Sequence, residues 1–381
     1  MQIKTVAEIN KYTGRSVNPM DFPEQLFELY SVPSFETGYP EIIKGVEIGS
    51  TKITVEEGDV LICKINPRIN RVWVVKHNTE YPLLASSEWI VVRNNEIDSD
   101  YLKCYFSSPT FRTLLTSQVA GIGGSLTRAQ PKQVAKYPVP VPNALEQKRI
   151  SNLLNDVSRL ISLRKEQLAK LDQLVKSRFI ELFGNSDYPS EPLDNNVIEM
   201  FIGPFGSSLK NEFFVDEEDG FCMVYEQKHA IQKTMDVPTR YVPKSKYEEL
   251  KRFTILGGDI IVSCRGTIGE IYTVPDDAPM GIMHPSIMKI RLNTEKYNQK
   301  FFVFALEQYM DEHSAEAKGS GVKMAVSATI LGQSDFVVPP MEVQNQFAAF
   351  VEQTDKSKLA IQQSLDKLET LKKSLMQEYF G

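Results

Sequence analysis

Two long stretches, residues 145–183 and 342–380, constrain the fold of this chain more than any other feature. In both, apolar residues recur at alternating steps of three and four, without an internal glycine or proline. This repeat predicts a long helix that needs a partner along its whole length, roughly 58 Å for 39 residues. The expected interface residues are Ile150, Leu154, Val157, Ile161, Leu168, Leu171 and Val175 in the first stretch, and Phe347, Val351, Ile361, Leu365, Leu368, Leu371 and Leu375 in the second.

The two stretches are related copies of each other. A shift of 197 positions aligns them without a gap and matches Pro142 with Pro339, Gln147 with Gln344, and Phe183-Gly184 with Phe380-Gly381. Two related helices in one chain indicate an internal duplication, and an antiparallel pair would bury both stripes. The second copy is interrupted by Thr354 and Lys358. The alternative is two unrelated amphipathic helices, each packed on its own core.

The segments that precede the two helices repeat one order of elements. In the first, runs rich in Ile and Val at residues 52–55, 60–65, 71–75 and 88–93 predict short strands, and residues 257–263 and 287–292 parallel two of them. We therefore predict an α+β protein with two mixed α/β domains separated by two long antiparallel coiled-coil helices. The expected boundaries are 1–142 for the first domain, 143–184 for the central helix acting as a spacer, 185–340 for the second domain, and 341–381 for the C-terminal helix.

Composition narrows the class of protein. The 381 residues are enough for two or three domains, and 42% hydrophobic with 24% charged residues is ordinary for a globular chain. The start, MQIKTVAEIN, does not look like a signal peptide, and no 18-residue apolar run is present. Four scattered cysteines fit reduced thiols, so we expect a cytoplasmic protein. The net charge is −6, and residues 185–340 alone carry −8, so DNA binding would need local basic patches or partner subunits.

The sequence shows no catalytic apparatus. It contains neither G-x-G-x-x-G nor G-x-x-x-x-G-K-[ST], and it lacks G-x-S-x-G. The four histidines are isolated in the sequence, and Asp311-Glu312-His313 reads better as a solvated helix end than as a metal site, because adjacent residues on a helix point apart. We therefore expect no catalytic residue, no metal and no cofactor in this chain.

This layout of domain, helix, domain, helix resembles the specificity (S) subunit of type I restriction–modification enzymes over the whole chain. The resemblance rests on the paired Pro, Gln and Phe-Gly helix segments, on the strands that begin Gly58-Asp59 and Gly258-Asp259, and on the loop 203–207. It implies two target-recognition domains, each reading half of a split, asymmetric double-stranded DNA site. It also implies two DNA methyltransferase (modification) subunits as partners, which a restriction (motor–nuclease) subunit can join. S-adenosylmethionine, ATP and Mg would then belong to those partners.

Basic and amide side chains on loops after strands are the candidates for DNA contact. Arginine and lysine suit phosphate or guanine, and asparagine and glutamine suit adenine. Alternatively, all of these residues are ordinary solvated surface. Trp73 and Trp89 lie in strand-like runs and are expected in the core. The candidates are Lys64, Asn66, Arg68, Arg71, Arg128 and Lys132 in the first domain, and Lys210, Gln227, Lys228, Arg265 and Lys323 in the second.

The prediction is thus a non-catalytic, sequence-specific DNA-binding subunit that also acts as a scaffold. Two other classes stay open at this point. One is a structural coiled-coil protein for assembly or tethering, without DNA specificity. The other is an enzyme with an unrecognised site in the first domain.

Overall fold

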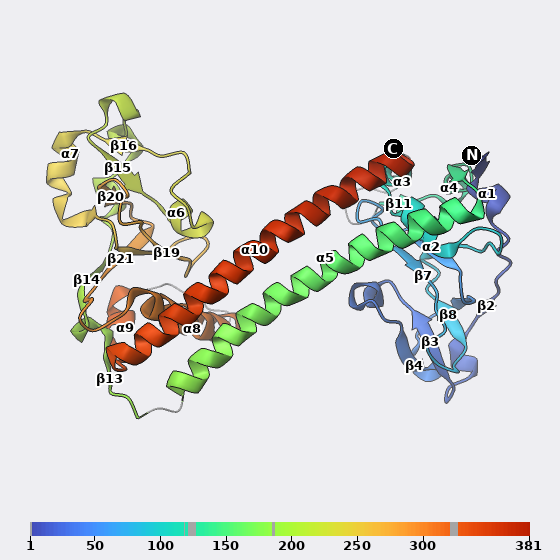
Figure 1. Cartoon of the computed structure of the whole chain (residues 1–381), viewed down its shortest axis with the longest axis horizontal. Coiled ribbons are helices and arrows are strands. Elements are labelled where there is room, and N and C mark those ends of the chain that lie inside the picture. Colours follow the sequence, from blue (N-terminus) through green and yellow to red (C-terminus); the bar gives the residue numbers. More distant parts are fainter. Residues whose placement is uncertain (1, 118, 121–126, 185–186, 321–326) are drawn as a thin grey trace. The chain divides into compact units, whose positions relative to one another are not determined.

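A computed structural model describes residues 2–117, 119–120, 127–184, 187–320 and 327–381 of the protein (Figure 1). The chain divides into two compact units. Unit 1 consists of Met1–Gln167 with Ile361–Gly381, and unit 2 of Leu168–Ala360. Each unit therefore holds one half of each long helix. No helix among the described residues combines the length and the hydropathy needed to cross a membrane.

Unit 1 contains three main sheets. A five-stranded sheet has the order β2-β5-β8-β3-β4, a three-stranded antiparallel sheet has the order β7-β6-β9, and β1 pairs with β12. The strands are β1 Gln2–Thr5, β2 Ser16–Val17, β3 Leu26–Tyr30, β4 Glu41–Lys44, β5 Lys52–Thr54, β6 Val60–Cys63, β7 Val72–Val74, β8 Leu83–Ala85, β9 Trp89–Val92, β10 Val119–Ala120, β11 Arg128–Ala129 and β12 Pro138–Val141. The short helices are α1 Val6–Ile9, α2 Ser99–Phe106, α3 Pro109–Ser117 and α4 Pro131–Val134.

Unit 2 also contains three sheets. Their orders are β16-β15-β20-β17, β14-β21-β18-β19 and β13-β22. The strands are β13 Ser190–Pro192, β14 Val197–Ile202, β15 Cys222–Tyr225, β16 Tyr241–Val242, β17 Thr254–Ile255, β18 Ile260–Ser263, β19 Ile271–Thr273, β20 Gly281–Met283, β21 Ile287–Leu292 and β22 Asp335–Val337. The helices are α6 Gln227–Gln232, α7 Lys244–Glu249, α8 Gln299–Ser320 and α9 Ala328–Gln333.

The strand orders confirm the internal duplication. The order β7-β6-β9 recurs as β19-β18-β21, β5-β8-β3-β4 recurs as β17-β20-β15-β16, and β1-β12 recurs as β13-β22. Even the one parallel pairing is repeated, because β3 runs parallel to β8 as β15 does to β20. The units differ by additions at sheet edges, namely β2 in the first and β14 in the second. The predicted strands over 52–55, 60–65, 71–75 and 88–93 correspond to β5, β6, β7 and β9.

A buried ion pair recurs before the central strand of each unit. Asp59 accepts two hydrogen bonds of 2.7 Å from the Arg93 guanidinium, and Asp259 accepts two of 2.7 Å from Arg291. Both carboxylates are almost fully buried, and each also accepts the backbone N–H three residues earlier. The glycine before each aspartate has a positive φ, 88° at Gly58 and 82° at Gly258, a conformation that glycine adopts at little cost.

The two long helices pair antiparallel, as the apolar repeat predicts (Figure 1, green α5 and red α10). Helix α5 covers Ala144–Phe179 and continues as a π-helical turn over Ile180–Gly184, and α10 covers Met341–Phe380. Within unit 1, Lys165 forms an ion pair of 2.9 Å with Glu369. Within unit 2, Lys358 forms an ion pair of 2.6 Å with Asp172. The lysine that interrupts the second apolar stripe is therefore neutralised by a carboxylate of the facing helix.

Burial along the stripe follows the position of each residue relative to the two cores. Ile150 and Leu154 belong to the core of unit 1, and Val175 and Phe347 to that of unit 2. Val157 and Leu365 are also buried, whereas Ile161, Leu168, Leu171, Val351, Ile361, Leu368 and Leu375 are half-buried. Leu371 is 44% exposed because it stands one position beside the repeat, where Lys372 takes the half-buried place.

The repeated glutamine joins each long helix to its domain. Gln147 accepts the backbone N–H of Asp98 at 2.9 Å through Oε1 and donates from Nε2 to the Pro142 carbonyl at 2.8 Å. Gln344 makes the equivalent bonds to Asn298 and Pro339, both 2.8 Å, and a third to the Lys296 carbonyl at 2.9 Å. Both side chains are buried. The match between Gln147 and Gln344 in the sequence therefore marks a shared structural joint.

Candidate nucleic-acid interface

In unit 1 the loop that follows β6 brings several of the predicted DNA-contact residues together. The Lys64 N–H donates to the Glu88 carbonyl at 2.9 Å, and Ala129 donates to the Lys64 carbonyl at 2.9 Å. Ile65 forms an isolated antiparallel bridge with Arg128, and the Asn66 N–H donates to Thr127. Segment 127–129 therefore lies beside loop 64–71, and we call Lys64, Asn66, Arg68, Arg71 and Arg128 the first cluster.

The backbone of this loop is tightly turned. Asn66 and Asn70 have positive φ values of 47° and 51°, which asparagine tolerates better than most residues. The Asn70 side chain donates to the Phe106 carbonyl at 3.0 Å and anchors the loop on helix α2. As a result Arg68 and Ile69 are exposed at the tip.

Acidic neighbours hold some of the cations of the first cluster. Arg71 donates from Nε to Glu36 at 2.9 Å, and its side chain is only 16% exposed. Arg128 pairs with Glu88 at 3.1 Å. In the described part of the chain, Lys64, Arg68 and Lys132 form no ion pair, so these three charges are available to an anion. Lys132 lies exposed on the short helix α4.

In unit 2 three loops meet at the equivalent edge. The His284 N–H donates to the Tyr225 carbonyl at 2.8 Å, and the Cys264 N–H donates to the Ser286 carbonyl at 2.8 Å. Segments 226–228, 264–269 and 284–286 therefore adjoin where β15, β18 and β20 end. We call Gln227, Lys228, Arg265 and His284, with Glu226 and Arg240, the second cluster.

Glu226 organises the cations of the second cluster. Its carboxylate is mostly buried, accepts a hydrogen bond from Arg240 and forms an ion pair of 2.7 Å with Lys228. Burial by itself would raise the pKa of Glu226, but the hydrogen bonds from Arg240 and Lys228 outweigh it, and the net pKa is lowered. Glu226 therefore stays ionised and holds both cations in place. Arg265 is exposed and has no ion pair among the described residues.

His284 lies among these charges as a neutral ring. Burial lowers its pKa; nearby Glu226 opposes the shift, whereas Arg240, Arg265 and Lys228 add to it. Its Nδ1 lies 3.2 Å from the Ser286 N–H, which donates to it, and 2.8 Å from the Ser286 hydroxyl. Since Nδ1 accepts a backbone N–H, the proton of the neutral imidazole is on Nε2.

Like the His229 ring at Nε2, the Gln227 amide has an atom without a hydrogen-bond partner among the described residues. Its Oε1 is buried and has no hydrogen-bond partner among the described residues. Gly266, at φ 68°, lies against it: a Cβ at that glycine would stand 3.7 Å from the Gln227 Nε2. Close by, His229 is fully buried, its Nδ1 accepts the Glu226 N–H at 3.0 Å, and burial lowers its pKa.

The remaining sequence candidates lie elsewhere. Lys210 is exposed in the loop after β14 and stands 3.8 Å from Glu212. Lys323 lies outside the described residues. Trp89 is buried and packs edge-on against Trp73, which confirms that the tryptophans belong to the core. His284, Arg240 and Glu226 were missed by sequence reasoning, because the pairing of β15 with β20 brings in His284 and the pairing of β15 with β16 brings in Arg240.

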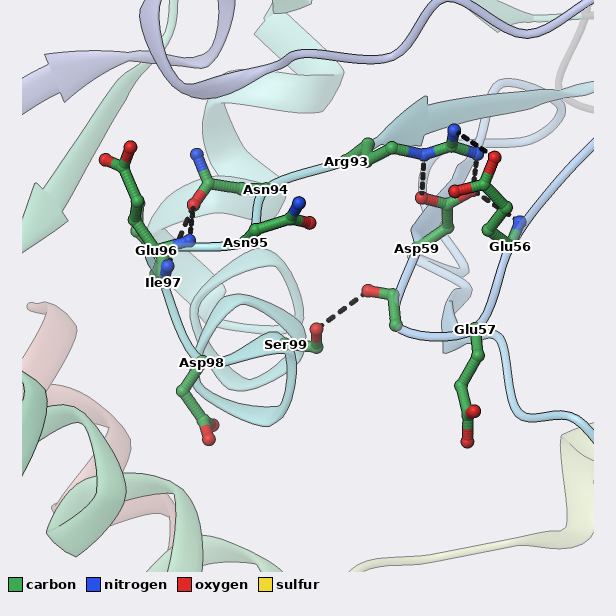
Figure 2. Close-up of a pocket in the computed structure, with 11 residues that line it drawn as sticks. Glu56, Glu57, Asp59, Arg93, Asn94, Asn95, Glu96, Ile97, Asp98 and Ser99 are labelled. Atoms are coloured by element: carbon green, nitrogen blue, oxygen red, sulfur yellow. Dashed lines mark hydrogen bonds and ion pairs between the residues drawn. The ribbon is translucent and has the colours of Figure 1, made fainter.

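A pocket of about 430 Å³ in unit 1 lies at the other end of β6 (Figure 2). Residues 56–59 precede that strand, whereas the first cluster follows it. Figure 2 shows Arg93 bridging Asp59 and Glu56 at the wall, and Ser99 bonded to the Gly58 carbonyl. Glu57, Glu96 and Asp98 add further carboxylates, of which Glu96 pairs with Lys11 and Asp98 with Lys148, so the lining is mainly acidic and unfavourable for a phosphate backbone. Among the described residues, no group of three or more His, Cys, Asp or Glu side chains is arranged to hold a metal ion.

Comparison with known proteins shows which proteins this chain resembles in sequence. Residues 220–372 match the family model of the type I restriction modification DNA specificity domain. The chain is 24% identical over 358 residues to the putative MjaX type I restriction enzyme specificity subunit of Methanocaldococcus jannaschii, covering 89% of this chain and 81% of that protein.

Two solved structures share the fold of the whole chain. One comes from work on complex assembly and conformational transition of the type I R-M system; it has a TM-score of 0.62 at 17% identity and covers 100% of this chain and 97% of that one. The other is the S subunit of a type I restriction–modification system from M. genitalium, with a TM-score of 0.54 at 12% identity, covering 100% and 96%. At these identities the two structures establish the fold alone. The similarity to specificity subunits in sequence comes from the family model and from the M. jannaschii protein.

Proposed function

We propose that this chain, like the type I restriction–modification specificity subunits that it resembles, is a non-catalytic DNA-recognition subunit, and that its two halves each read one half of a bipartite, asymmetric DNA target. The first cluster would contact one half-site and the second cluster the other. Cations near each cluster would bind phosphate and position the protein, and amide, guanidinium and imidazole groups would contact base edges.

The observation that supports this proposal most is that the loop after β6 in unit 1 and the loop after β18 in unit 2 are held in the same way but carry different side chains. The Lys64 N–H and the Cys264 N–H make the same bond to the segment before the next strand, so the two loops are equivalent in backbone. Their side chains are not equivalent: the first loop carries Lys64, Asn66, Arg68 and Arg71, whereas Arg265 is the only basic residue of segment 264–269. Base edges are distinguished by donor and acceptor pattern, so different side chains favour different half-sites.

The proposed layout keeps recognition domains at 1–142 and 185–340, with long helices at 143–184 and 341–381. We propose that the helices hold two modification subunits and that restriction subunits can join the complex. The methyltransferase partners would bind S-adenosylmethionine and flip the target base, and the motor partner would use ATP and Mg. We place the protein in the cytoplasm, with the DNA that it reads. The alternative of a tethering protein without DNA specificity is not supported, because the family match covers most of the second domain.

The test is to map the methylated sites of cells that express this chain with its modification subunits. Replacing Lys64 and Arg128 with alanine should relax or abolish recognition in one half of the motif only, at about 1–3 kcal/mol for each good base contact that the substitution removes. Lys136→Ala, an exposed lysine of the same unit, is the matched control. Equal loss in both halves, or an unchanged motif, would contradict the assignment of half-sites to clusters.

A further inference from the structure

Unit 2 is acidic overall, and the charge balance of the second cluster differs from it. Residues 185–340 carry a net charge of −8. In the second cluster the balance is reversed, because Arg240, Lys228 and Arg265 surround a single ionised carboxylate, that of Glu226. A local positive potential in an acidic domain selects where a polyanion can approach. The second cluster is therefore the part of this edge to which a duplex would be drawn.

Besides the fully buried Nε2 of His229, two polar groups in this positive region lack a hydrogen-bond partner among the described residues. The Gln227 Oε1 is buried without a partner among the described residues, and a buried acceptor left unpaired costs about as much as a lost hydrogen bond. The His284 Nε2–H has no partner there either, while Nδ1 is engaged by Ser286. Glutamine offers one acceptor and one donor side by side, and the imidazole offers one donor of fixed direction.

Glycine backbone lies against both residues. Gly266, which has a left-handed φ of 68° and no side chain, lies against the Gln227 amide, whose Oε1 is buried; a base can therefore reach this oxygen only when the amide turns outward past the glycine. On the other side, a Cβ at Gly203 would stand 2.3 Å from the His284 carbonyl, so loop 203–206 passes directly over the backbone of this histidine. Gly203 thus allows loop 203–206 to pack on the His284 backbone, and at Gly266 the Gln227 amide is bordered by backbone without a side chain.

We propose that Gln227 reads an adenine in the major groove and that His284 donates from Nε2 to a purine N7 or O6 of a neighbouring base pair, an assignment that rests on the proposed DNA-recognition function. The Gln227 amide matches adenine with Oε1 accepting from N6 and Nε2 donating to N7. Glu226, held by Arg240 and Lys228, positions the start of α6 and hence Gln227. Arg265 binds the adjacent phosphate.

The experiment uses the complex of the full chain with its modification subunits. The probe is a duplex carrying the motif that the wild-type complex methylates, with 7-deazaadenine placed in turn at each adenine of that motif. At one adenine the analogue should weaken binding by the wild-type complex and leave binding by the Gln227→Ala complex unchanged. Gln227→Ala itself should reduce discrimination at that base pair by roughly 5- to 150-fold. His284→Ala should do the same at a neighbouring purine. Gln232→Ala, an exposed glutamine of the same helix, is the control.

The outcomes separate the two proposals. If the wild-type complex shows no preferred motif, the proposed function fails. If the wild-type complex selects a motif but Gln227→Ala retains full discrimination at every position, the function stands and the adenine assignment is overturned. A uniform loss over all sequences, with an unchanged thermal unfolding midpoint, would show that these side chains contact only the phosphate backbone, which also overturns the assignment.

Discussion

The joint between helix and domain supplies a prediction whose magnitude follows from counting bonds. Gln344→Ala removes three hydrogen bonds and leaves the Asn298 N–H and two carbonyl groups without that partner in a buried site. At roughly 1 kcal/mol per bond, with more for each group left unpaired, we expect a loss of about 2–4 kcal/mol in the free energy of unfolding. Gln147→Ala removes two bonds, so its cost should be smaller by about 1 kcal/mol.

Urea unfolding followed by circular dichroism measures the two costs, and hydrogen exchange locates them. The Asn298 amide should exchange faster in Gln344→Ala, and the Asp98 amide faster in Gln147→Ala, each without an effect on the other. Gln346→Ala, an exposed residue of α10, should leave both unchanged. Equal costs for the two variants, or a cost below about 0.5 kcal/mol for Gln344→Ala, would refute the view that these bonds tie the helices to their domains.

Three further predictions follow from burial and charge. His229 and His284 have lowered pKa values in the folded chain, chiefly through burial, so the unfolded chain takes up their protons first. The contribution of these two histidines to the free energy of unfolding should be fully present above the unfolded histidine pKa of about 6.5 and should be lost as the pH falls below it. Urea midpoints at pH 7.5 and 5.5 test this, and His229→Gln should reduce the decline. Leu154→Ala, in the core, should cost about 2–5 kcal/mol, whereas Leu371→Ala should cost under about 1 kcal/mol, which thermal unfolding can distinguish. Phe205→Ala should leave stability unchanged because the ring is 87% exposed; a large drop in the unfolding midpoint would mean that the loop packs in a way this exposure does not allow.

The sequence predicted the features that repeat locally. The apolar repeat identified both long helices to within a few residues, since few structures besides a paired helix produce an apolar stripe of this length. The Gly-Asp turns identified β6 and β18 because the same short motif occurs twice. For Leu371 the stripe prediction is wrong: hydrophobicity favours this leucine over the lysine beside it, yet Lys372 occupies the half-buried position through its long apolar stem.

The second cluster was only partly predictable, for a topological reason. Gln227 and Lys228 could be recognised as a polar run after a strand, and Arg265 as a lone cation on a turn. Their proximity to His284 depends on the parallel pairing of β15 with β20, which are far apart in the chain. Parallel pairing leaves no hairpin signal in the sequence, because the connection is long. His284 is therefore isolated in the sequence and becomes part of a cluster only in the fold.

The repeat also explains how one scaffold can serve two different readouts. At the start of the central strands, both units have the same buried aspartate–arginine pair, and at the start of the long helices both have the same glutamine joint. At the other end of those strands, the loops carry different side chains. A strand of four residues, with a rise of about 3.3 Å per residue, separates the two ends by roughly 13 Å. Side chains at this loop end, the proposed DNA-reading end, can therefore vary without disturbing the packing that ties the domain to its helix. Two diverged halves thus remain compatible with one antiparallel helix pair.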